Sequence, residues 1–126
     1  RYSLAHQGTN EVIWDWELKN DHIYLSSRWN ALLGLGNSAA SSDPNAWLAR
    51  IHPEDRTRFE QTLQHYLEQR HQKFYCEYRL RHANGDYIWV LAKGKALWDE
   101  AGIAYRMVGS QADITFRKSQ EAEAYQ

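Results

Sequence analysis

The sequence is poor in cysteine and proline, carries almost no net charge and lacks a long apolar run. Its one cysteine, Cys76, excludes an internal disulfide framework and a metal site built from several cysteines. No apolar run approaches the roughly 20 residues of a membrane helix, so we expect no direct membrane contact. A net charge of −1 lacks the clustered positive charge of a nucleic-acid-binding surface, so we expect no nucleic-acid partner.

Both ends of the chain suggest a piece of a longer protein. Position 1 is not a methionine, and the last residues form a charged, helix-prone stretch. No signal-peptide pattern opens the sequence. Together with a reduced thiol, these features predict a cytoplasmic location, either free or as the cytoplasmic part of a membrane-anchored protein.

What the sequence does contain is typical of one globular domain rich in aromatic residues. Its 126 residues suit a single domain, and 43% hydrophobic with 25% charged residues is an ordinary globular composition. Six tryptophans and eight tyrosines are a high aromatic content. Many of these rings must be buried or cover a face, because exposed aromatic patches promote association.

The first half of the chain predicts a hairpin followed by three helices. Residues 1–10 are compatible with a short entry helix. Residues 12–18 alternate apolar and polar side chains, which indicates a strand, and a turn at Asn20-Asp21 leads to a second strand over 22–26.

Three helix starts and one clear helix end follow. Ser26 or Ser27 is predicted to cap a helix that ends at Gly34 and Gly36. Asp43 with Pro44 places an acidic cap before a proline and opens a short helix to about residue 51. The longest helix is predicted over 53–70, with His52 at its cap position.

The second half predicts three long strands and a final helix. A strand over 73–82 leads into Asn84-Gly85, the favoured two-residue hairpin turn. The next strand covers 87–98, and Gly94 within it suggests a bulge or a close backbone approach. A turn ending at Gly102 leads to a strand over 103–114, and residues 116–126 are charged and helix-prone.

The predicted order is therefore β-β-α-α-α-β-β-β-α, an α+β class. Two groups of strands interrupted by helices indicate one five-stranded antiparallel sheet with the helices packed on one face. The space between the sheet and the long helix is where a ligand would bind.

Several short motifs, in this order and spacing, resemble a PAS domain with a PAC-type C-terminal half, over about residues 5–118. They are Trp14-Asp15-Trp16, Ser26-Ser27-Arg28-Trp29, Ile51-His52-Pro53-Glu54-Asp55-Arg56, Tyr78-Arg79-Leu80-Arg81, Asn84-Gly85, Trp89-Val90, Gly102, Arg106, Gly109 and Asp113-Ile114-Thr115. The resemblance implies the spatial strand order 2-1-5-4-3, a PAS/PAC sensory domain over 1–115 and the start of a linker helix over 116–126. It also implies a regulatory module, with no chemistry of its own, in a multidomain bacterial signalling protein.

The resemblance further implies a covalently linked output domain. Similar domains precede diguanylate cyclase and cyclic-di-GMP phosphodiesterase domains, or histidine kinase domains, and the opening of this chain looks most like the cyclic-di-GMP group. The alternatives are the sensor of a histidine kinase, or a flavin- or haem-binding redox or gas sensor. The sequence departs from the family pattern at two positions. Asn84 replaces the usual aspartate of the Asn84-Gly85 turn, and Phe116 replaces the usual acidic residue after Asp113-Ile114-Thr115.

The tripeptide Asp113-Ile114-Thr115 has two interpretations. Its Asp and Thr side chains can bond to nearby backbone and simply cap the final helix. Alternatively, it is a hinge where the state of the sheet sets the direction of that helix, and the resemblance implies this role for Asp113. We predict a set of signal-transmitting residues, which also includes two tryptophans on one face of the first strand: Asp113, Ile114, Thr115, Trp14 and Trp16.

The aromatic residues between the sheet and the helices also have two interpretations. Rings of this size commonly form a core without any ligand. If a small-molecule ligand binds, the candidate pocket residues are Trp29, Leu33, Trp47, Ile51, Phe59, Tyr66, Tyr78 and Trp89. The sequence does not name the signal or the output domain, and we expect a homodimer.

A resident cofactor has little support in the residues. Steps of about 100° per residue place His65 outside the arc of Phe59, Leu63 and Tyr66, so it should face solvent and is a poor haem ligand. The flavin-binding cysteine motif of light-sensing relatives is missing, and Cys76 on a strand is expected to be a small buried hydrophobe. No metal site is expected, while flavin or haem stays a minor alternative that visible absorbance would reveal.

Catalysis is also poorly supported. His52 with Glu54 and Asp55 could suggest acid–base chemistry, but a helix start explains the three residues as a cap and dipole partners. We therefore expect no catalytic residue. A pocket enzyme, or a sheet that stacks RNA bases on its aromatic residues, would need convergent acids or flanking basic residues that the sequence does not show.

Overall fold

A computed structural model describes residues 11–37, 41–69 and 73–124 of the chain. The predicted entry helix over 1–10 lies outside these residues. The strands are β1 (Val12–Glu17), β2 (His22–Leu25), β3 (Phe74–Arg81), β4 (Tyr87–Trp98) and β5 (Ala104–Asp113). The helices are α1 (Arg28–Leu33), α2 (Pro44–Leu48), α3 (Pro53–Gln69) and α4 (Thr115–Ala124).

The five strands form one antiparallel sheet in the order β2-β1-β5-β4-β3, which confirms the predicted fold. The last three strands follow one another along the chain, and β5 then pairs with β1 at the centre of the sheet. In the register, Trp14 of β1 lies opposite Gly109 of β5, and Gly109 lies opposite Gly94 of β4. This central position lets β5 contact both halves of the sheet.

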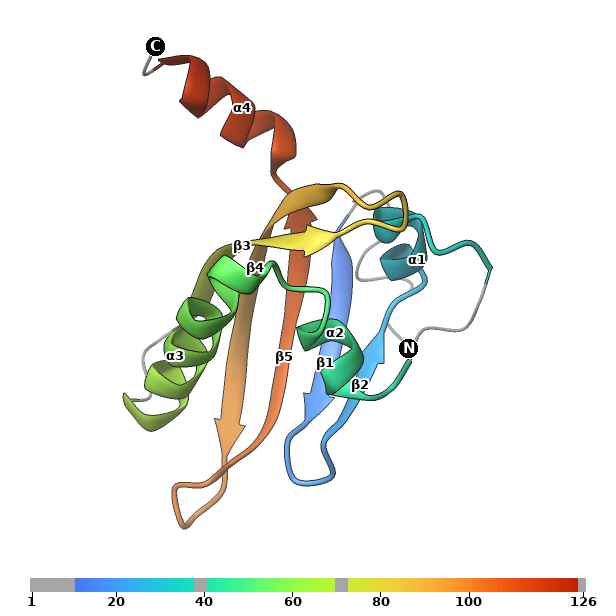
Figure 1. Ribbon diagram of the computed structural model, residues 1–126. Helices are drawn as coiled ribbons and strands as arrows, with labels where there is room; N and C mark the ends of the chain where they lie inside the picture. Colours follow the sequence, from blue (N-terminus) through green and yellow to red (C-terminus); the bar gives the residue numbers. More distant parts are fainter. Residues whose placement is uncertain (1–10, 38–40, 70–72, 125–126) are drawn as a thin grey trace.

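Helices α1, α2 and α3 cover one face of the sheet, whereas α4 leaves the end of β5 and points away from the body (Figure 1). We call the covered face the inner face and the other the outer face. The prediction that the helices pack on one face is therefore correct for the first three. Side chains at the start of α4, just after the C-terminal end of β5, contact Glu77 and Trp89 of the outer face instead.

Residues with capping preferences correctly predicted most of the helix ends. Asp43 caps α2 by accepting a hydrogen bond from the Asn45 amide (3.0 Å), and His52 Nδ1 accepts one from the Glu54 amide (3.0 Å) at the start of α3. α1 ends at Gly34, whose φ of 69° suits a residue without Cβ. The side-chain cap predicted at Ser26 or Ser27 is wrong: Ser26 Oγ accepts from the Ile13 amide (2.9 Å), because β1 lies beside it.

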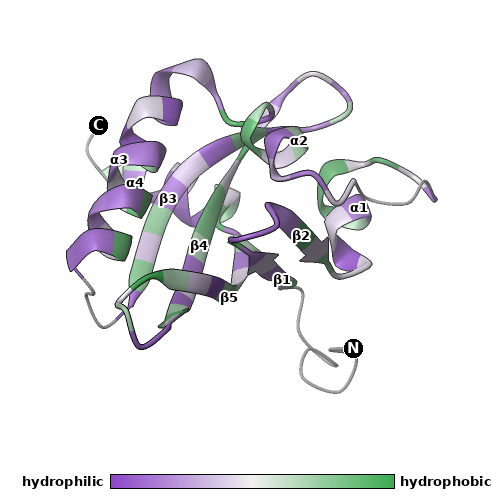
Figure 2. Ribbon diagram, turned by 90° about the horizontal axis from the view of Figure 1, so that it is seen from below, coloured by the Kyte–Doolittle hydropathy of each residue, from purple (hydrophilic) through white to green (hydrophobic). Residues whose placement is uncertain are grey.

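Strands β3 and β4 have one covered and one open face, and along β3 hydrophobic residues alternate with hydrophilic ones (Figure 2). Phe74, Cys76, Tyr78 and Leu80 are buried under the helices, as period two requires. The turn between β3 and β4 uses Gly85 with φ 94°, in line with the Asn-Gly prediction.

Gly94 marks a close approach rather than a bulge, since the register shift lies between Leu97 and Trp98. The Trp14 ring lies directly over the facing Gly94 and Gly109. A Cβ built on Gly94 would be 2.8 Å from Trp14 Cζ2, and one on Gly109 would overlap both the Trp14 ring and the Lys93 carbonyl oxygen. Only glycine leaves room for the indole there.

Candidate functional site

The junction between β5 and α4 is hydrogen-bonded to β4 through Trp89. Its carbonyl oxygen accepts a hydrogen bond from the Ile114 amide (2.8 Å), and its amide donates to Thr115 Oγ1 (3.0 Å). Asp113 Oδ1 accepts from the Thr115 amide (2.8 Å) at the start of α4. The predicted tripeptide therefore starts α4 and is also hydrogen-bonded to β4. A shift of β4 relative to β5 would distort these hydrogen bonds.

Side chains on the first turn of α4 are held by the outer face of the sheet. Glu77 of β3 accepts from Arg117 (2.6 Å) and from Lys118 (3.2 Å), and both cations also pair with Glu121. The Lys118 ammonium lies 4.6 Å from the centre of the Trp89 ring. Hydrogen bonding from Arg117 lowers the pKa of Glu77, and hydrogen bonding to Glu77 raises the pKa of Lys118. These residues orient α4 relative to the sheet.

The same Trp89 ring contacts a second cation, Arg79, which lies opposite Trp89 on the neighbouring strand β3. The Arg79 guanidinium lies 5.2 Å from the ring centre. Arg79 also donates to both carboxylate oxygens of Asp55 (2.9 and 2.8 Å) and to Glu54 (3.2 Å), in the first turn of α3. Contacts therefore run from the start of α3 through Arg79 and Trp89 to α4.

Substituting Glu77 with glutamine should loosen α4 without unfolding the sheet. The change removes the anion that pairs with Arg117 and Lys118, and exposed ion pairs of this kind contribute about 0.2–1 kcal/mol each. Amide hydrogen exchange in α4 should become roughly threefold to tenfold faster, as mass spectrometry of the isolated domain can measure.

The matched control is Glu60→Gln, which changes an exposed glutamate of α3. It should leave exchange in α4 unchanged. If Glu77→Gln also left α4 exchange at the wild-type rate, Glu77 would not orient the helix.

Seven of the eight predicted pocket residues do come together on the inner face, as parts of the buried core. Trp47 is at the centre, with ring centroids 5.6 Å from Trp14, 6.0 Å from Trp16 and 5.9 Å from Phe59. The others are buried around it: Trp29, Leu33, Ile51, Tyr66 and Tyr78. Trp14 and Trp16, predicted to transmit a signal, belong to this packing and lie opposite Gly109 and Met107 of β5.

Trp89 is the exception, and its assignment to the pocket is wrong. It lies on the outer face between Arg79 and Lys118, on the side away from Trp47 and Phe59. Its neighbours in β4, Val90 and Ala92, point into the core instead. Its role in the structure is to anchor the β5–α4 junction.

A buried polar chain crosses the core and was not found from the sequence. Trp47 Nε1 donates to Tyr78 Oη (2.9 Å), which donates in turn to Gln111 Oε1. Gln111 is fully buried on β5. Among the described residues, neither its Nε2 nor Trp14 Nε1 has a hydrogen-bond partner. Burial raises the pKa of Tyr78 well above its ordinary value, so its hydroxyl stays a donor. This chain links α2 to the strand that leads into α4.

A second unpredicted feature is the ion pair of Asp15 and Arg106 on the outer face. Asp15 has 1% of its surface exposed and accepts from Arg106 through both oxygens (2.9 and 2.6 Å). Period two correctly places Asp15 opposite to Trp14 and Trp16 across β1. Arg106 was among the residues that resemble a PAS domain. Its pairing with Asp15 could not be predicted, because it depends on the register between β1 and β5.

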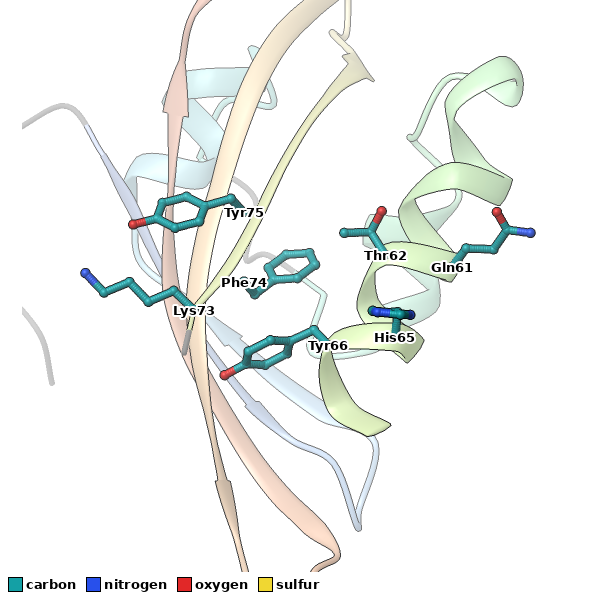
Figure 3. Close-up of a pocket in the computed structure, with 7 residues that line it drawn as sticks. All are labelled: Gln61, Thr62, His65, Tyr66, Lys73, Phe74 and Tyr75. Atoms are coloured by element: carbon teal, nitrogen blue, oxygen red, sulfur yellow. The ribbon is translucent and has the colours of Figure 1, made fainter. Parts of the chain in front are cut away.

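An open pocket of about 430 Å³ lies between α3 and β3 at the edge of the sheet (Figure 3). Phe74 and Tyr66 point toward each other across it, whereas Lys73 and Tyr75 point to the far side of β3. The α3 wall carries polar groups from Gln61, Thr62 and His65. Its aromatic and polar lining could hold a small molecule with both kinds of surface.

Neither of the histidines weighed as haem ligands, His65 and His52, points into the core, and Cys76 is not placed for a covalent flavin bond. His65 is exposed at the pocket rim, His52 caps α3, and the Trp47 and Phe59 rings fill the space beneath the helices. Cys76 is buried, and burial raises the pKa of its thiol. Within residues 11–37, 41–69 and 73–124, no three His, Cys, Asp or Glu side chains could hold a metal ion together.

Comparison with known proteins agrees with this architecture. A family model described as "PAS fold" matches residues 22–111, most of the chain. The chain belongs to the PAS fold family. The PAS domain is also 30% identical over 120 residues to the sensor protein FixL of Bradyrhizobium diazoefficiens, which covers 95% of the chain and 23% of FixL.

Solved structures of PAS domains superpose on it over most of their length. A sensory box histidine kinase/response regulator from Burkholderia thailandensis gives a TM-score of 0.85 at 36% identity, covering 99% of this chain and 92% of that one. The N-terminal domain of a diguanylate cyclase with PAS/PAC sensor from Marinobacter aquaeolei gives 0.73 at 21% identity, covering 86% and 98%.

These relatives place the chain among sensory domains of signalling proteins. It spans 23% of the length of FixL and 12% of an uncharacterized protein from Sinorhizobium fredii, to which it is 32% identical over 100 residues. No helix in the described parts of the PAS domain is long and apolar enough to cross a membrane.

Proposed function

We propose that this PAS domain detects a ligand or partner on its helical side and transmits the change through β5 and α4 to an output domain. The observation that carries the proposal is the junction at Trp89, where the start of α4 is hydrogen-bonded to β4. The Trp89 ring also contacts Arg79, which holds the start of α3. We expect two orientations of α4 in equilibrium, each coupled to a position of α3 and β4. A ligand that binds one of these positions more tightly than the other shifts this equilibrium.

The input would reach the junction by one of two physical routes. Occupation of the pocket between α3 and β3 would move Tyr66 and Phe74, and through them the edge of the sheet. Alternatively, a change near α2 would act on the Trp47–Tyr78–Gln111 chain and so on β5. Both routes end at the residues that orient α4.

A histidine kinase is the output that we favour. The support is the 36% identity to the PAS domain of a sensory box histidine kinase, higher than the 21% to the diguanylate cyclase sensor. The cyclic-di-GMP output predicted from the opening of the sequence is the second candidate. The domain boundary near residue 115 and the cytoplasmic location stay predictions.

We further propose that α4 joins two copies of the chain in a homodimer. Phe116, in the first turn of α4, has 76% of its surface exposed, which is unusual for a large apolar side chain. A second copy of α4 would cover it and continue into the linker. Paired α4 helices would convert a tilt in each protomer into a relative rotation that an output enzyme can respond to.

Asp113→Ala in the full-length protein tests the transmission directly. Asp113 is exposed, and within the described parts of the chain its carboxylate accepts a hydrogen bond from the Thr115 amide alone, so the isolated domain should lose no more than about 1 kcal/mol of stability. The activity of the output enzyme, in contrast, should no longer respond to the input signal.

The control is Asp86→Ala, the same change at an exposed aspartate in the β3–β4 turn. It should preserve both stability and response. A normal response of output activity in the Asp113→Ala protein would show that the junction does not carry the signal.

A further inference from the structure

The outer face of the sheet contains a hollow of about 530 Å³, on the side opposite to α1–α3. The register places its residues in adjacent rows: Ile13, Ser110, Lys93 and Tyr75 lie side by side across four strands, and the next row contains Val108 and Lys95. The complete lining is Glu11, Ile13, Lys73, Tyr75, Lys93, Gly94, Lys95, Val108, Gly109 and Ser110.

Three lysines and one glutamate, Glu11, border this hollow, and no described residue forms an ion pair with any of the lysines. Lys73, Lys93 and Lys95 are exposed, and in the described part of the chain no ion pair or hydrogen bond involves their side chains. Arg79, Arg106, Arg117 and Lys118, in contrast, each have a carboxylate partner on or beside the same face.

The positive charges of Lys73, Lys93 and Lys95 lie close together on the outer face. Lys93 and Lys95 are two residues apart on one strand, so their side chains lie on the same face, and Tyr75 beside Lys73 is directly opposite Lys93. Like charges grouped in this way repel one another and attract anions. The chain as a whole has a net charge of −1, so this basic cluster is local.

The hollow combines the lysines with an apolar surface. Its floor includes Ile13 and Val108, and Tyr75, 52% exposed, stands at its border. Figure 3 shows Tyr75 and Lys73 pointing together to the side of β3 away from α3. Aromatic residues beside apolar surface are typical of protein interfaces. Because the hollow lies on an open sheet face, an extended polypeptide can reach its apolar floor and its lysines together.

We propose that this hollow is a docking surface for an acidic polypeptide segment of a partner protein, with apolar side chains on the floor and carboxylates at the three lysines. The charges argue against a second copy of the same face. A two-fold symmetric contact brings each patch against itself, so the lysines of both copies would meet. This surface is separate from the α4 contact proposed for the homodimer.

The experiment uses the isotope-labelled domain and synthetic peptides in which leucine alternates with glutamate, glutamine or lysine. The leucine–glutamate peptide should shift the NMR signals of Lys93, Lys95 and Tyr75, and bind at least about tenfold more tightly than the glutamine peptide at low salt. High salt should remove this difference, because it screens exposed charges. The lysine peptide should not bind.

The double variant Lys93→Gln/Lys95→Gln should lower the affinity for the leucine–glutamate peptide about tenfold. The control Lys19→Gln, at a lysine paired with Asp99 outside the hollow, should leave that affinity unchanged. The thermal midpoint of the double variant at low salt should equal or exceed that of the wild type, since a repulsion is removed.

Four results of the binding and stability measurements would overturn the proposal. They are equal binding of the glutamate and glutamine peptides, shifts confined to other surfaces, binding of inorganic phosphate alone as tight as that of the peptide, and loss of stability in the double variant. The third would indicate a small-anion site, and the fourth would show that the lysines support the fold. A change of oligomeric state in the double variant would instead identify a self-interface and also reject the proposal.

Discussion

The Gly109→Ala variant should fail to fold into a stable domain. The new Cβ would overlap the carbonyl oxygen of Lys93 on the neighbouring strand as well as the Trp14 ring. A side chain could rotate away, but the backbone oxygen belongs to the β4–β5 ladder at the centre of the sheet and cannot move without breaking it. We expect a loss of about 3 kcal/mol or more, the upper end for overpacking, seen as a lower urea midpoint or insoluble expression.

Gly36→Ala is the matched control. A Cβ at that position meets nothing within 4 Å, and only its φ of 72° disfavours alanine, at a cost of roughly 1–2 kcal/mol. The comparison separates steric overlap at Gly109 from the backbone preference of glycine. A Gly109→Ala protein as stable as Gly36→Ala would mean that the sheet can accommodate a methyl group against Trp14.

The Asp55→Ala variant should lose about 2–3 kcal/mol of stability at neutral pH. The Asp55 side chain is 7% exposed and accepts hydrogen bonds from the Arg79 guanidinium and from the Arg79 backbone amide (2.9 Å). Removing it takes the acceptor from the Arg79 amide and the closest carboxylate from the guanidinium, which keeps its contact with Glu54. The cost is below that of a fully buried pair because the Arg79 side chain is 25% exposed and partly solvated.

The loss should depend on pH in a direction that the structure defines. Hydrogen bonding from Arg79 lowers the pKa of Asp55 in the folded domain, despite the opposing effect of burial. The pair therefore contributes its full stability above the unfolded pKa, about 3.9, and loses it as the pH falls through the lower folded pKa. The difference between wild type and Asp55→Ala should be largest near pH 7 and should shrink below about pH 4.

Urea unfolding of both proteins at several pH values provides the measurement. Asp86→Ala, at an exposed turn, should change the free energy of unfolding by less than about 0.5 kcal/mol at neutral pH. A difference between wild type and Asp55→Ala that stayed constant down to acid pH would show that ionised Asp55 is not what stabilises the start of α3.

Local chemistry explains why so many element boundaries could be predicted. Asp43 with Pro44, and Asn84 with Gly85, act through their own backbone conformations, and the structure places a helix start and a hairpin turn there. The 87–98 strand was predicted with the bounds of β4. In contrast, Ser26 bonds to a strand rather than capping α1, because its partner comes from a different element.

The candidate site was predictable only in part, for a related reason. Period two shows that Trp89 and Leu91 share a face of β4, but not which face the helices cover. Trp89 was therefore placed among the pocket residues, while the structure puts it at the junction with α4. Gln111 could not be singled out either, because its importance depends on burial beside Tyr78.

The sequence alone determined the order and length of the strands and helices, the turn positions and the resemblance to PAS domains, since these follow from patterns within a few neighbouring residues. Tertiary structure alone decided that Trp14 lies over two facing glycines, that Asp15 pairs with Arg106, and that Glu77 and Trp89 hold α4. The physical reason is that each of these contacts joins residues far apart in the chain. Their geometry depends on strand register and on which face the helices cover, and neither is encoded in a local pattern.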